Sequence, residues 1–232
     1  MQKPVNMEEL KVRIESLLLM KKSAQDAVHN ELNYSYAQIK PHFLYNTLNT
    51  IIGLSYSDEE RTREALGHLA TYFRAKLNFR NKRSLVPLED EIELVLAYLA
   101  IEQIRFGEKL HIEYDIDNTI ETYIPSMTLQ PLVENAVQHG ISKNKDGGIL
   151  RLTIERELQN VKITIEDNGI GISEAKQQEL LSNKNGGLGF TNPFNKLSLV
   201  KGTSFQLKSK VGKGTKITIR IPEVKNNESI IN

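Results

Sequence analysis

The stretch Asp167-Asn168-Gly169-Ile170-Gly171 follows a β-branched run in the second half of the chain and combines an acidic residue with two glycines. Two further glycine-bearing segments come after it, Gly186-Gly187-Leu188-Gly189 and Gly212-Lys213-Gly214-Thr215. Each segment alone is typical of a turn, a flexible loop or a hairpin, and for each alone that ordinary explanation is favoured. Their fixed order in one domain, behind Glu134-Asn135-Ala136 on a predicted helix, is much less easily explained by turns and indicates one shared site.

The first and third segments suit an adenine ring. Asp167 ends a predicted strand, where its carboxylate can accept a hydrogen bond from an exocyclic adenine amine. Gly169 and Gly171 let the chain turn tightly beside the base, because glycine adopts backbone conformations that other residues avoid. Thr215 is expected to support the adenine contact from the neighbouring strand. Together these residues predict selection of adenine.

The second segment and the predicted helix suit phosphates. Gly187, Leu188 and Gly189 come at the start of a predicted helix, so their amides and the helix N-terminus can face anionic groups. Asn135 offers a neutral oxygen to a Mg²⁺ ion that keeps several waters and bridges phosphates. His139 lies one turn later on the same face, and it either donates to a phosphate oxygen or is a partly buried histidine at a helix end.

This combination resembles the ATP-binding fold shared by histidine kinases, type II topoisomerases, heat-shock chaperones and mismatch-repair ATPases. The resemblance implies ATP as the nucleotide, Mg²⁺ as its ion and Asn135 as the residue that holds this ion. In the topoisomerase and chaperone ATPases a carboxylate four residues before this asparagine activates the hydrolytic water, whereas this chain has Pro131 there. Glu134 points about 100° away around the helix. Transfer to a protein group is therefore favoured over transfer to water, with Ser173 to Asn185 as a short mobile lid.

The protein group is expected in Gln38-Ile39-Lys40-Pro41-His42-Phe43-Leu44-Tyr45-Asn46-Thr47-Leu48-Asn49. This segment closely resembles the phosphoacceptor signature of sensor kinases of the LytS type. The block Val86-Pro87-Leu88-Glu89-Asp90-Glu91, with Tyr98 and Arg105-Phe106 after it, is similar to the second block of that family. The resemblance extends over residues 35–222. It implies a dimeric protein-histidine kinase that phosphorylates His42 from Mg-ATP and passes the phosphoryl group to an aspartate of a response-regulator receiver domain.

A neutral His42 can act as a nucleophile through its unprotonated ring nitrogen, and the resulting phosphoramidate stays reactive enough to pass the group on. Catalysis would be mainly positioning and charge neutralisation. In many sensor kinases the next residue is acidic and takes or orients the proton, but this chain has Phe43, so the general base is not identified. Asn46, one turn further, either hydrogen-bonds the other ring nitrogen, positions a water for dephosphorylation, or packs in a helix bundle.

The fold class that we expect is α+β. From Met7 to about Arg83 the chain reads as helix, with Pro41 kinking or restarting it just before His42. Ser57-Asp58-Glu59-Glu60 combines a helix cap with an acidic first turn and opens a second helix that runs through Phe79. The two helices form a hairpin that buries little apolar surface alone, and a homodimeric four-helix bundle would solve that problem.

After a junction at Asn81 to Pro87, apolar residues at helical spacing predict a helix over Leu88 to Phe106. Short β-branched runs and helical stretches then predict an α/β sandwich of the histidine-kinase ATPase (Bergerat) type, in which a mixed sheet has helices on one face. The predicted strands are His111 to Ile116, Ile149 to Glu155, Val161 to Glu166, Phe205 to Ser209 and Thr215 to Ile221, and the predicted helices are Met127 to His139 and Leu188 to Val200.

These patterns divide the chain into a signalling helix or coiled coil at 1–34, a dimerisation and phosphoacceptor hairpin at 35–85, an ATP-binding domain at 86–222 and a flexible tail at 223–232. Apolar residues from Leu10 to Val28 alternate at spacings of four and three, as in a short coiled coil. An amphipathic helix that packs on its own domain explains them about as well. A coiled-coil beginning would place a sensor upstream.

Composition sets outer limits. Apolar residues make up 39% and charged residues 25% of the chain, as in ordinary globular proteins. The net charge of +1, with scattered basic residues, gives no reason to expect a nucleic-acid partner. No cysteine is present, which excludes disulfides and thiolate metal sites. Leu94 to Ile101 is the longest apolar stretch and is too short to span a membrane. We expect a cytoplasmic location, as the cytoplasmic part of a membrane-anchored sensor, and structural roles for His29, His68 and His111.

Two other functions stay open. A nucleotide-sensing module or pseudokinase would bind ATP without phosphotransfer, and Phe43 in place of an acidic residue supports it. Stable label on His42 would exclude this alternative. An ATP-hydrolysing conformational machine is disfavoured by Pro131, and multiple-turnover phosphate release without a partner would favour it again.

Overall fold

The computed structural model describes residues 40–79, 85–181, 188–198 and 200–224. The chain divides into two compact units, Met1–Asn49 and Thr50–Asn232. The coiled-coil segment, the start of the phosphoacceptor signature, His29, Gly187 and the tail beyond 224 lie outside the described residues. The elements are α2 (Pro41–Ser55), α3 (Glu59–Asn78), β1 (Leu85–Pro87), α4 (Leu88–Phe106), β2 (Leu110–Ile116), β3 (Tyr123–Pro125), α5 (Leu129–Asn135), β4 (Gly148–Glu157), β5 (Asn160–Asp167), α6 (Glu174–Leu181), α7 (Leu188–Ser198), β6 (Ser204–Lys210) and β7 (Gly214–Pro222).

The helical region starts and stops where the sequence predicts. Helix α2 begins at Pro41, whose fixed φ suits a first helical position. Asp58 caps α3 by accepting a hydrogen bond from the backbone N–H of Arg61 at 2.9 Å, and Glu59 and Glu60 occupy its first turn. Acidic side chains in this position complement the positive end of the helix dipole. The predicted second helix is thus confirmed, with Asp58 as its cap.

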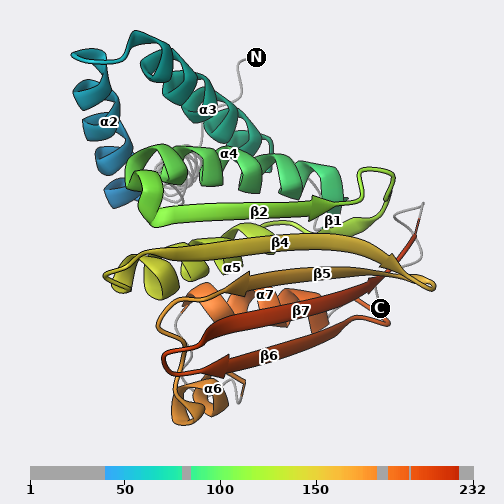
Figure 1. Ribbon diagram of the computed structural model, residues 1–232. Helices are drawn as coiled ribbons and strands as arrows, with labels where there is room; N and C mark the ends of the chain where they lie inside the picture. The colour runs from blue at the N-terminus through green and yellow to red at the C-terminus, as the bar shows by residue number, and fades with distance from the viewer. Residues whose placement is uncertain (1–39, 80–84, 182–187, 199, 225–232) are drawn as a thin grey trace, which may run out of the picture. The chain divides into compact units, whose positions relative to one another are not determined.

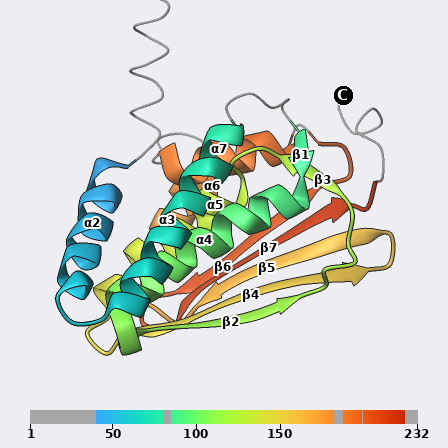
Figure 2. The same cartoon turned by 90° about the horizontal axis from the view of Figure 1, so that it is seen from above.

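Five strands form the main sheet in the order β2-β4-β5-β7-β6. Strands β2 and β4 are parallel, and the other neighbouring pairs are antiparallel. Helices α4, α5 and α7 cover one face of this sheet, as Figures 1 and 2 show from two directions. All five predicted strands are present within two residues of their expected ends. The predicted mixed sheet with helices on one face is confirmed.

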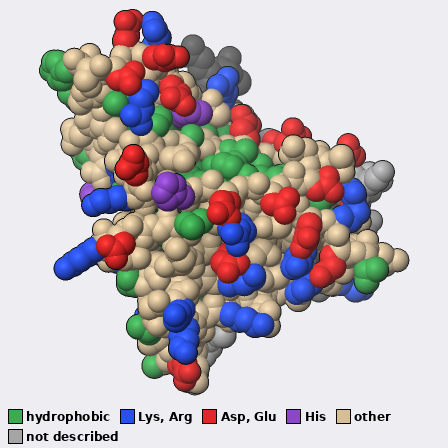
Figure 3. Space-filling view, in the orientation of Figure 1, with side chains coloured by type: hydrophobic (Ala, Val, Ile, Leu, Met, Phe, Trp, Pro, Cys, Tyr) green, Lys and Arg blue, Asp and Glu red, His purple; other side chains and the backbone are tan. Residues whose placement is uncertain are grey.

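Alternation along the strands explains the two faces of the sheet. The central strands bury apolar side chains at every second position, namely Leu150, Leu152 and Ile154 on β4, Ile163 and Ile165 on β5, and Ile217, Ile219 and Ile221 on β7. Successive side chains of a strand point to opposite faces, so the residues between them lie on the other face, where the charged side chains are exposed or half-buried and Thr164 and Thr218 are buried. Cationic and anionic side chains lie side by side on that face (Figure 3). Lys216 and Glu166 form one such ion pair, at 2.8 Å.

A small antiparallel sheet of β1 and β3 was not predicted from the sequence. Each of its strands has three residues and ends at a proline, so there is too little alternation to read. Helix α4 runs over Leu88–Phe106 as predicted. The predicted helix from Met127 starts two residues later instead, because Met127 has a φ of 59° and cannot be helical.

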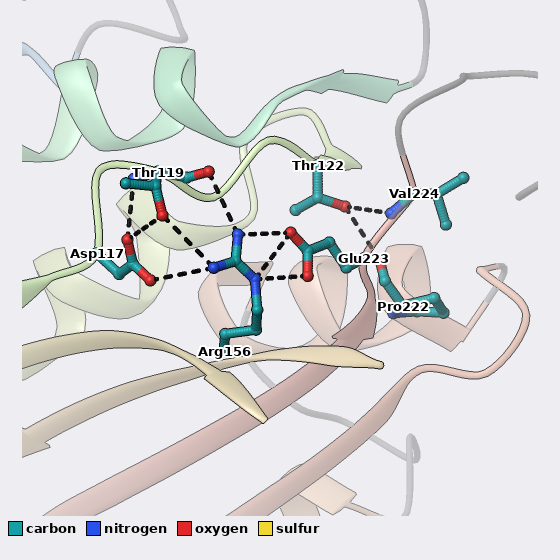
Figure 4. Close-up of polar contacts among 7 residues, drawn as sticks. All are labelled: Asp117, Thr119, Thr122, Arg156, Pro222, Glu223 and Val224. Atoms are coloured by element: carbon teal, nitrogen blue, oxygen red, sulfur yellow. Dashed lines mark hydrogen bonds and ion pairs between the residues drawn. The ribbon is translucent and has the colours of Figure 1, made fainter. Parts of the chain in front are cut away.

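At the far end of the sheet, where β4 stops, Arg156 joins three segments (Figure 4). Its guanidinium donates to both carboxylate oxygens of Glu223 at 2.8 Å and to the carbonyl oxygen of Thr119 at 3.3 Å. It also lies 3.6 Å from the Asp117 carboxylate. Thr122 donates to the carbonyl oxygen of Pro222 at 3.0 Å and so holds the end of β7. In the part of the chain that the structure describes, no helix is both long and apolar enough to cross a membrane.

Candidate active site

A cavity of about 280 Å³ opens between the end of β5, the start of β7 and helix α5. Of the predicted site residues, the cavity is lined by Asn135, His139, Asp167, Gly171 and Thr215. These residues come from three separate parts of the sequence. The structure therefore brings together the acidic, amide, imidazole and hydroxyl groups that the sequence predicted to share a site.

Asp167 is the buried acidic group of this cavity, with 5% of the residue exposed. Burial raises the pKa of its carboxyl group to about 6, against hydrogen bonds from the backbone of Gly169 and Thr215 that favour the charged form. The Gly169 N–H donates to Oδ1 at 2.9 Å. A carboxylate held this way keeps an acceptor available toward the cavity, which suits an exocyclic amine of a purine.

Close backbone contacts around Asp167 require glycine. Gly214 has a φ of 90°, and a Cβ there would overlap the backbone of Asp167. A Cβ on Gly169 would overlap the backbone of Gly140, at the end of the α5 region. Gly171 has a φ of 69° and packs against the backbone of Lys210. The chain therefore turns tightly here, where three strands and a helix end approach without side chains between them.

Helix α5 presents one face to the cavity. Leu132, Asn135, Ala136, His139 and Gly140 line it at spacings of three and four residues. A π-helical turn at Ala136–Gly140 follows Asn135 directly. Such turns are rare and often occur at functional sites. Asn135 and His139 both face the cavity, in agreement with the prediction that they share one side of the helix.

Glu91 holds the start of α5. Its carboxylate, fully buried, accepts hydrogen bonds from the backbone N–H groups of Met127, Thr128 and Leu129. Burial raises the pKa of Glu91 to about 7, against these three hydrogen bonds and the charge of Lys196. A residue from α4 thus supplies the cap that the sequence around α5 lacks, and it could not be read from local pattern.

The groups around the cavity fit a magnesium ion only if the substrate supplies most of its ligands. In the described ranges no three His, Cys, Asp or Glu side chains gather into a group that could hold a metal. Asn135 is half-buried and faces the cavity, so its amide oxygen can contribute one ligand. Mg²⁺ typically keeps several waters and takes its other ligands from phosphates, which matches this donor set.

The phosphate-side segments are described in part. Helix α6 occupies Glu174–Leu181, within the segment predicted to be a lid. Leu188 and Gly189 begin helix α7, and Gly187 falls outside the described residues. Their roles toward phosphates stay predictions.

His42 and Asn46 lie one turn apart on α2, and the His42 side chain is exposed. The Asn46 Nδ2 atom is 3.3 Å from both ring nitrogens of His42. An atom equally distant from both nitrogens is aligned with neither lone pair, since the two lone pairs diverge in the ring plane. The amide therefore lies beside the imidazole and leaves each ring nitrogen open to other partners.

Several lining residues were not predicted. Apolar side chains of Leu132, Ile165, Ile170, Ile172 and Ile217 form the walls, and Lys143 lies at the rim. Ile165 on β5 and Ile217 on β7 belong to the series of buried apolar residues at every second position of these strands. This alternation is the sequence signal that could have identified them. Asn168 was read only as part of a turn, yet its Oδ1 accepts from the N–H of Ile149 at 2.6 Å and ties β4 to the Asp167 turn.

Family models match both parts of the chain. The histidine kinase model matches residues 30–110, and the model of histidine kinase-, DNA gyrase B- and HSP90-like ATPases matches residues 125–225. The chain therefore belongs to the sensor histidine kinases, which are ATP-dependent protein-histidine kinases.

The relatives of this chain include named sensor proteins. The uncharacterized protein YwpD of Bacillus subtilis is 38% identical over 95% of this chain and 80% of its own length. The sensor protein LytS of Bacillus anthracis is 35% identical over 92% of this chain, which spans 37% of that protein. The sensor histidine kinase YpdA of Escherichia coli is 32% identical over 83% of this chain and 34% of its own length. This chain thus spans little more than a third of LytS and YpdA. The catalytic domain of the histidine kinase ThkA has the same fold, with a TM-score of 0.50 and 16% identity over 62% of this chain and 99% of that domain.

Proposed function

We propose that this chain transfers the γ-phosphoryl group of ATP to His42 and then to an aspartate of a response-regulator receiver domain. The observation that carries the proposal is the cavity, where the Asp167 carboxylate and the Asn135 amide face one space. Pro131 stands four residues before Asn135, so no side chain there can activate a water. The cavity is equipped to hold the nucleotide and not to hydrolyse it.

The adenine ring would lie between the apolar walls and the Asp167 turn. Ile165 and Ile217 offer flat apolar contact from neighbouring strands, and the Asp167 carboxylate accepts from the exocyclic amine. Thr215 lies 2.9 Å from Ser209, oxygen to oxygen, and Ser209 also donates to the Gly214 carbonyl at 2.8 Å. This hydroxyl pair supports the edge of the adenine site from β6 and β7.

The phosphates would extend along α5 toward its start, because Asp167 sits against its end at Gly140. Asn135 would hold Mg²⁺ through its amide oxygen, and His139 would donate to a phosphate oxygen. When bound, Mg²⁺ neutralises charge on the phosphate oxygens during transfer. The backbone of Gly187, Leu188 and Gly189 would cover the phosphates at the start of α7.

Transfer forms a bond from a His42 ring nitrogen to the γ-phosphorus and breaks the bond from that phosphorus to the bridging oxygen, so ADP leaves. The attacking nitrogen must be unprotonated, and the other ring nitrogen keeps its proton. A change of the Asn46 side-chain rotamer would bring its amide oxygen in line with that N–H, so that the oxygen accepts from it. Asn46 would thus fix the ring tautomer and orientation without acting as a base.

The partners belong to the same proposal. Two chains would pair their hairpins into a four-helix bundle, because exposed apolar side chains such as Tyr45, Leu48 and Ile52 follow one side of α2. A receiver aspartate would then take the phosphoryl group from His42. A cytoplasmic location downstream of a sensor segment stays a prediction based on the longer relatives.

A phosphate balance tests the proposed function. The purified chain is incubated with ATP and Mg²⁺, and free phosphate is measured alongside phosphoprotein. A kinase without its response regulator accumulates phosphoprotein up to one phosphoryl group per chain, and phosphate transfer then stops. Sustained phosphate release that His42→Gln leaves unchanged would overturn the proposal in favour of an ATPase.

A second candidate is an ATP-binding regulatory module without phosphotransfer. It is favoured by Phe43, which stands where many sensor kinases have an acidic residue and whose side chain cannot accept a proton. This module would bind ATP with the same Asp167 dependence and give no phosphoprotein at all. The same phosphate balance therefore separates the two candidates.

A further inference from the structure

A buried hydrogen-bonded network joins α3 to α5. The Lys76 ammonium donates to the Gln130 Oε1 atom and to the Tyr72 hydroxyl, each at 3.2 Å. The Gln130 Nε2 group donates to Glu134 Oε1 at 2.8 Å and to the same hydroxyl at 3.0 Å. The four residues are between 1% and 8% exposed. Buried polar groups of this kind are costly unless each is satisfied, so their geometry is strongly determined.

The Gln130 amide is oriented by charges of opposite sign. Its oxygen faces the Lys76 ammonium, and its amino group faces the Glu134 carboxylate. A flipped amide would place like-signed groups together at both ends, so one orientation is favoured. Gln130 therefore connects a cation on α3 to an anion on α5 by a dipole of fixed direction.

The network lies on a different face of α5 from the nucleotide cavity. Gln130 and Glu134 are four residues apart and share one side of the helix, whereas Asn135 and His139 share the side that lines the cavity. No member of the network lines the cavity. Glu134 directly precedes Asn135, so a rotation of α5 about its axis moves both side chains together.

The start of α5 is held separately. Glu91 fixes the first three backbone N–H groups of the α5 region, which sets where the helix begins. Helix α5 has only seven residues and then changes to a π-helical turn, and its apolar side chains Leu129, Leu132 and Val133 are fully buried. The Lys76 network adds a polar, lateral attachment one residue before Asn135.

We propose that Lys76 is a positioning residue for Asn135: through Gln130 and Glu134 it sets the rotation of α5 that directs the Asn135 amide toward the nucleotide-bound Mg²⁺. This inference rests on the proposed function only in taking Mg-ATP as the ligand. It gives α3, the helix that follows the phosphoacceptor helix, a direct influence on the nucleotide site. Lys76 itself contacts neither nucleotide nor ion.

The test compares ATP affinity in Mg²⁺ and in EDTA, together with thermal unfolding, for Lys76→Met, Glu134→Gln and the double variant. Methionine keeps the apolar length of lysine and removes its charge and donors. We expect Lys76→Met to weaken binding in Mg²⁺ by about tenfold, as for residues that orient metal ligands. Binding in EDTA should stay within about twofold, because adenine contacts are untouched.

The double variant separates positioning from stability. Lys76→Met removes the buried cation of the network, and adding Glu134→Gln removes the anion at its other end. We expect the double variant to recover melting temperature but not Mg²⁺-dependent affinity. It also carries the test if the single variant does not fold. Arg63→Met is the matched control on α3, since Arg63 pairs with Glu59 at the surface and should change neither quantity.

Two results would overturn the inference. Either the variants change melting temperature alone, with wild-type affinity in Mg²⁺, or affinity falls equally in Mg²⁺ and EDTA. A wild-type protein that binds Mg-ATP but never labels His42 would overturn the proposed function instead and would leave this binding test intact.

Discussion

The two ends of the main sheet use polar residues in opposite ways. At the far end, Arg156 is compensated by Glu223 and Asp117, and the pKa of Asp117 is lowered by hydrogen bonds from Thr119 and by the Arg156 charge. At the cavity end, Asp167 has backbone hydrogen bonds but no described cation within ion-pair distance, and burial raises its pKa. At the far end, the charges of Arg156 and its acidic partners compensate one another and join segments of the fold. At the cavity end, the Asp167 carboxyl group faces a largely apolar cavity, where a ligand can supply its hydrogen-bond partner.

The largest effect is expected from glycine substitutions, which should lower the free energy of unfolding very differently at Gly214 and at Gly212. Gly214→Ala adds a Cβ that overlaps the Asp167 backbone at a φ of 90°, and we expect a loss of about 3 kcal/mol or more in unfolding free energy. Gly212→Ala, two residues away with a φ of 74° and open space around it, should lose only about 1 kcal/mol. Urea unfolding of both variants measures this, and equal losses would contradict the close packing at the cavity end.

Asp167→Asn should weaken ATP binding by about 10- to 100-fold, since a hydrogen bond to a charged acceptor is replaced by a neutral one. Asparagine has nearly the same shape and can still accept from the Gly169 N–H. Equilibrium titration with a fluorescent adenine nucleotide measures the loss, and GTP serves as the control ligand. A variant that binds ATP as tightly as wild type would remove Asp167 from the adenine site.

The pH dependence of unfolding tests whether the Asp167 carboxyl group lacks a compensating charge. The Asp167 pKa is about 6 in the folded protein and about 3.8 in the unfolded chain, so the folded state binds more protons between these values. The contribution of the Asp167 carboxyl group to the free energy of unfolding is therefore largest at low pH, and it is lost as the pH rises from about 4 to about 6. We expect the stability of wild type minus that of Asp167→Asn to fall by about 1 to 3 kcal/mol over this range.

Glu91 also has a raised pKa and acts in an overlapping pH range. It is present in both proteins, so its contribution cancels in the difference. A difference that grows with rising pH would mean that Asp167 is stabilised in its charged form, as Asp117 at the far end is.

The smallest effect is expected at the far end. Arg156→Met removes exposed ion pairs, which usually contribute little and are screened by salt. The melting temperature should fall by at most a few degrees, and ATP affinity should stay within about twofold of wild type. A large loss of ATP affinity would show that the two ends are coupled through the sheet.

Local pattern predicted the main sheet, most of its helices and the polar residues of the cavity. The strands were found because apolar residues alternate, as at Ile217, Ile219 and Ile221, and α4 because its apolar residues recur at helical spacing. Asp167 was selected because it precedes Gly169 and Gly171, and Asn135 because it lies on a predicted helix before the glycine segments; the structure places both on one cavity.

The remaining features depend on residues distant in sequence. Glu91 caps a helix 38 residues away, and Lys76 reaches Gln130 across 54 residues. Neither periodicity nor propensity carries information on such pairs. The positive φ of Met127 follows from the turn around the Glu91 carboxylate, so the early helix start was wrong for the same reason.

We propose that ATP bound in the cavity is the source of a phosphoryl group that His42 accepts. Wild type, His42→Gln and Asn135→Ala are each incubated with γ-labelled ATP and Mg²⁺, and the acid lability of the label is then tested. We expect label on the wild type that acid removes, and none on either variant. Label that survives acid, or label that persists in His42→Gln, would rule out this phosphotransfer.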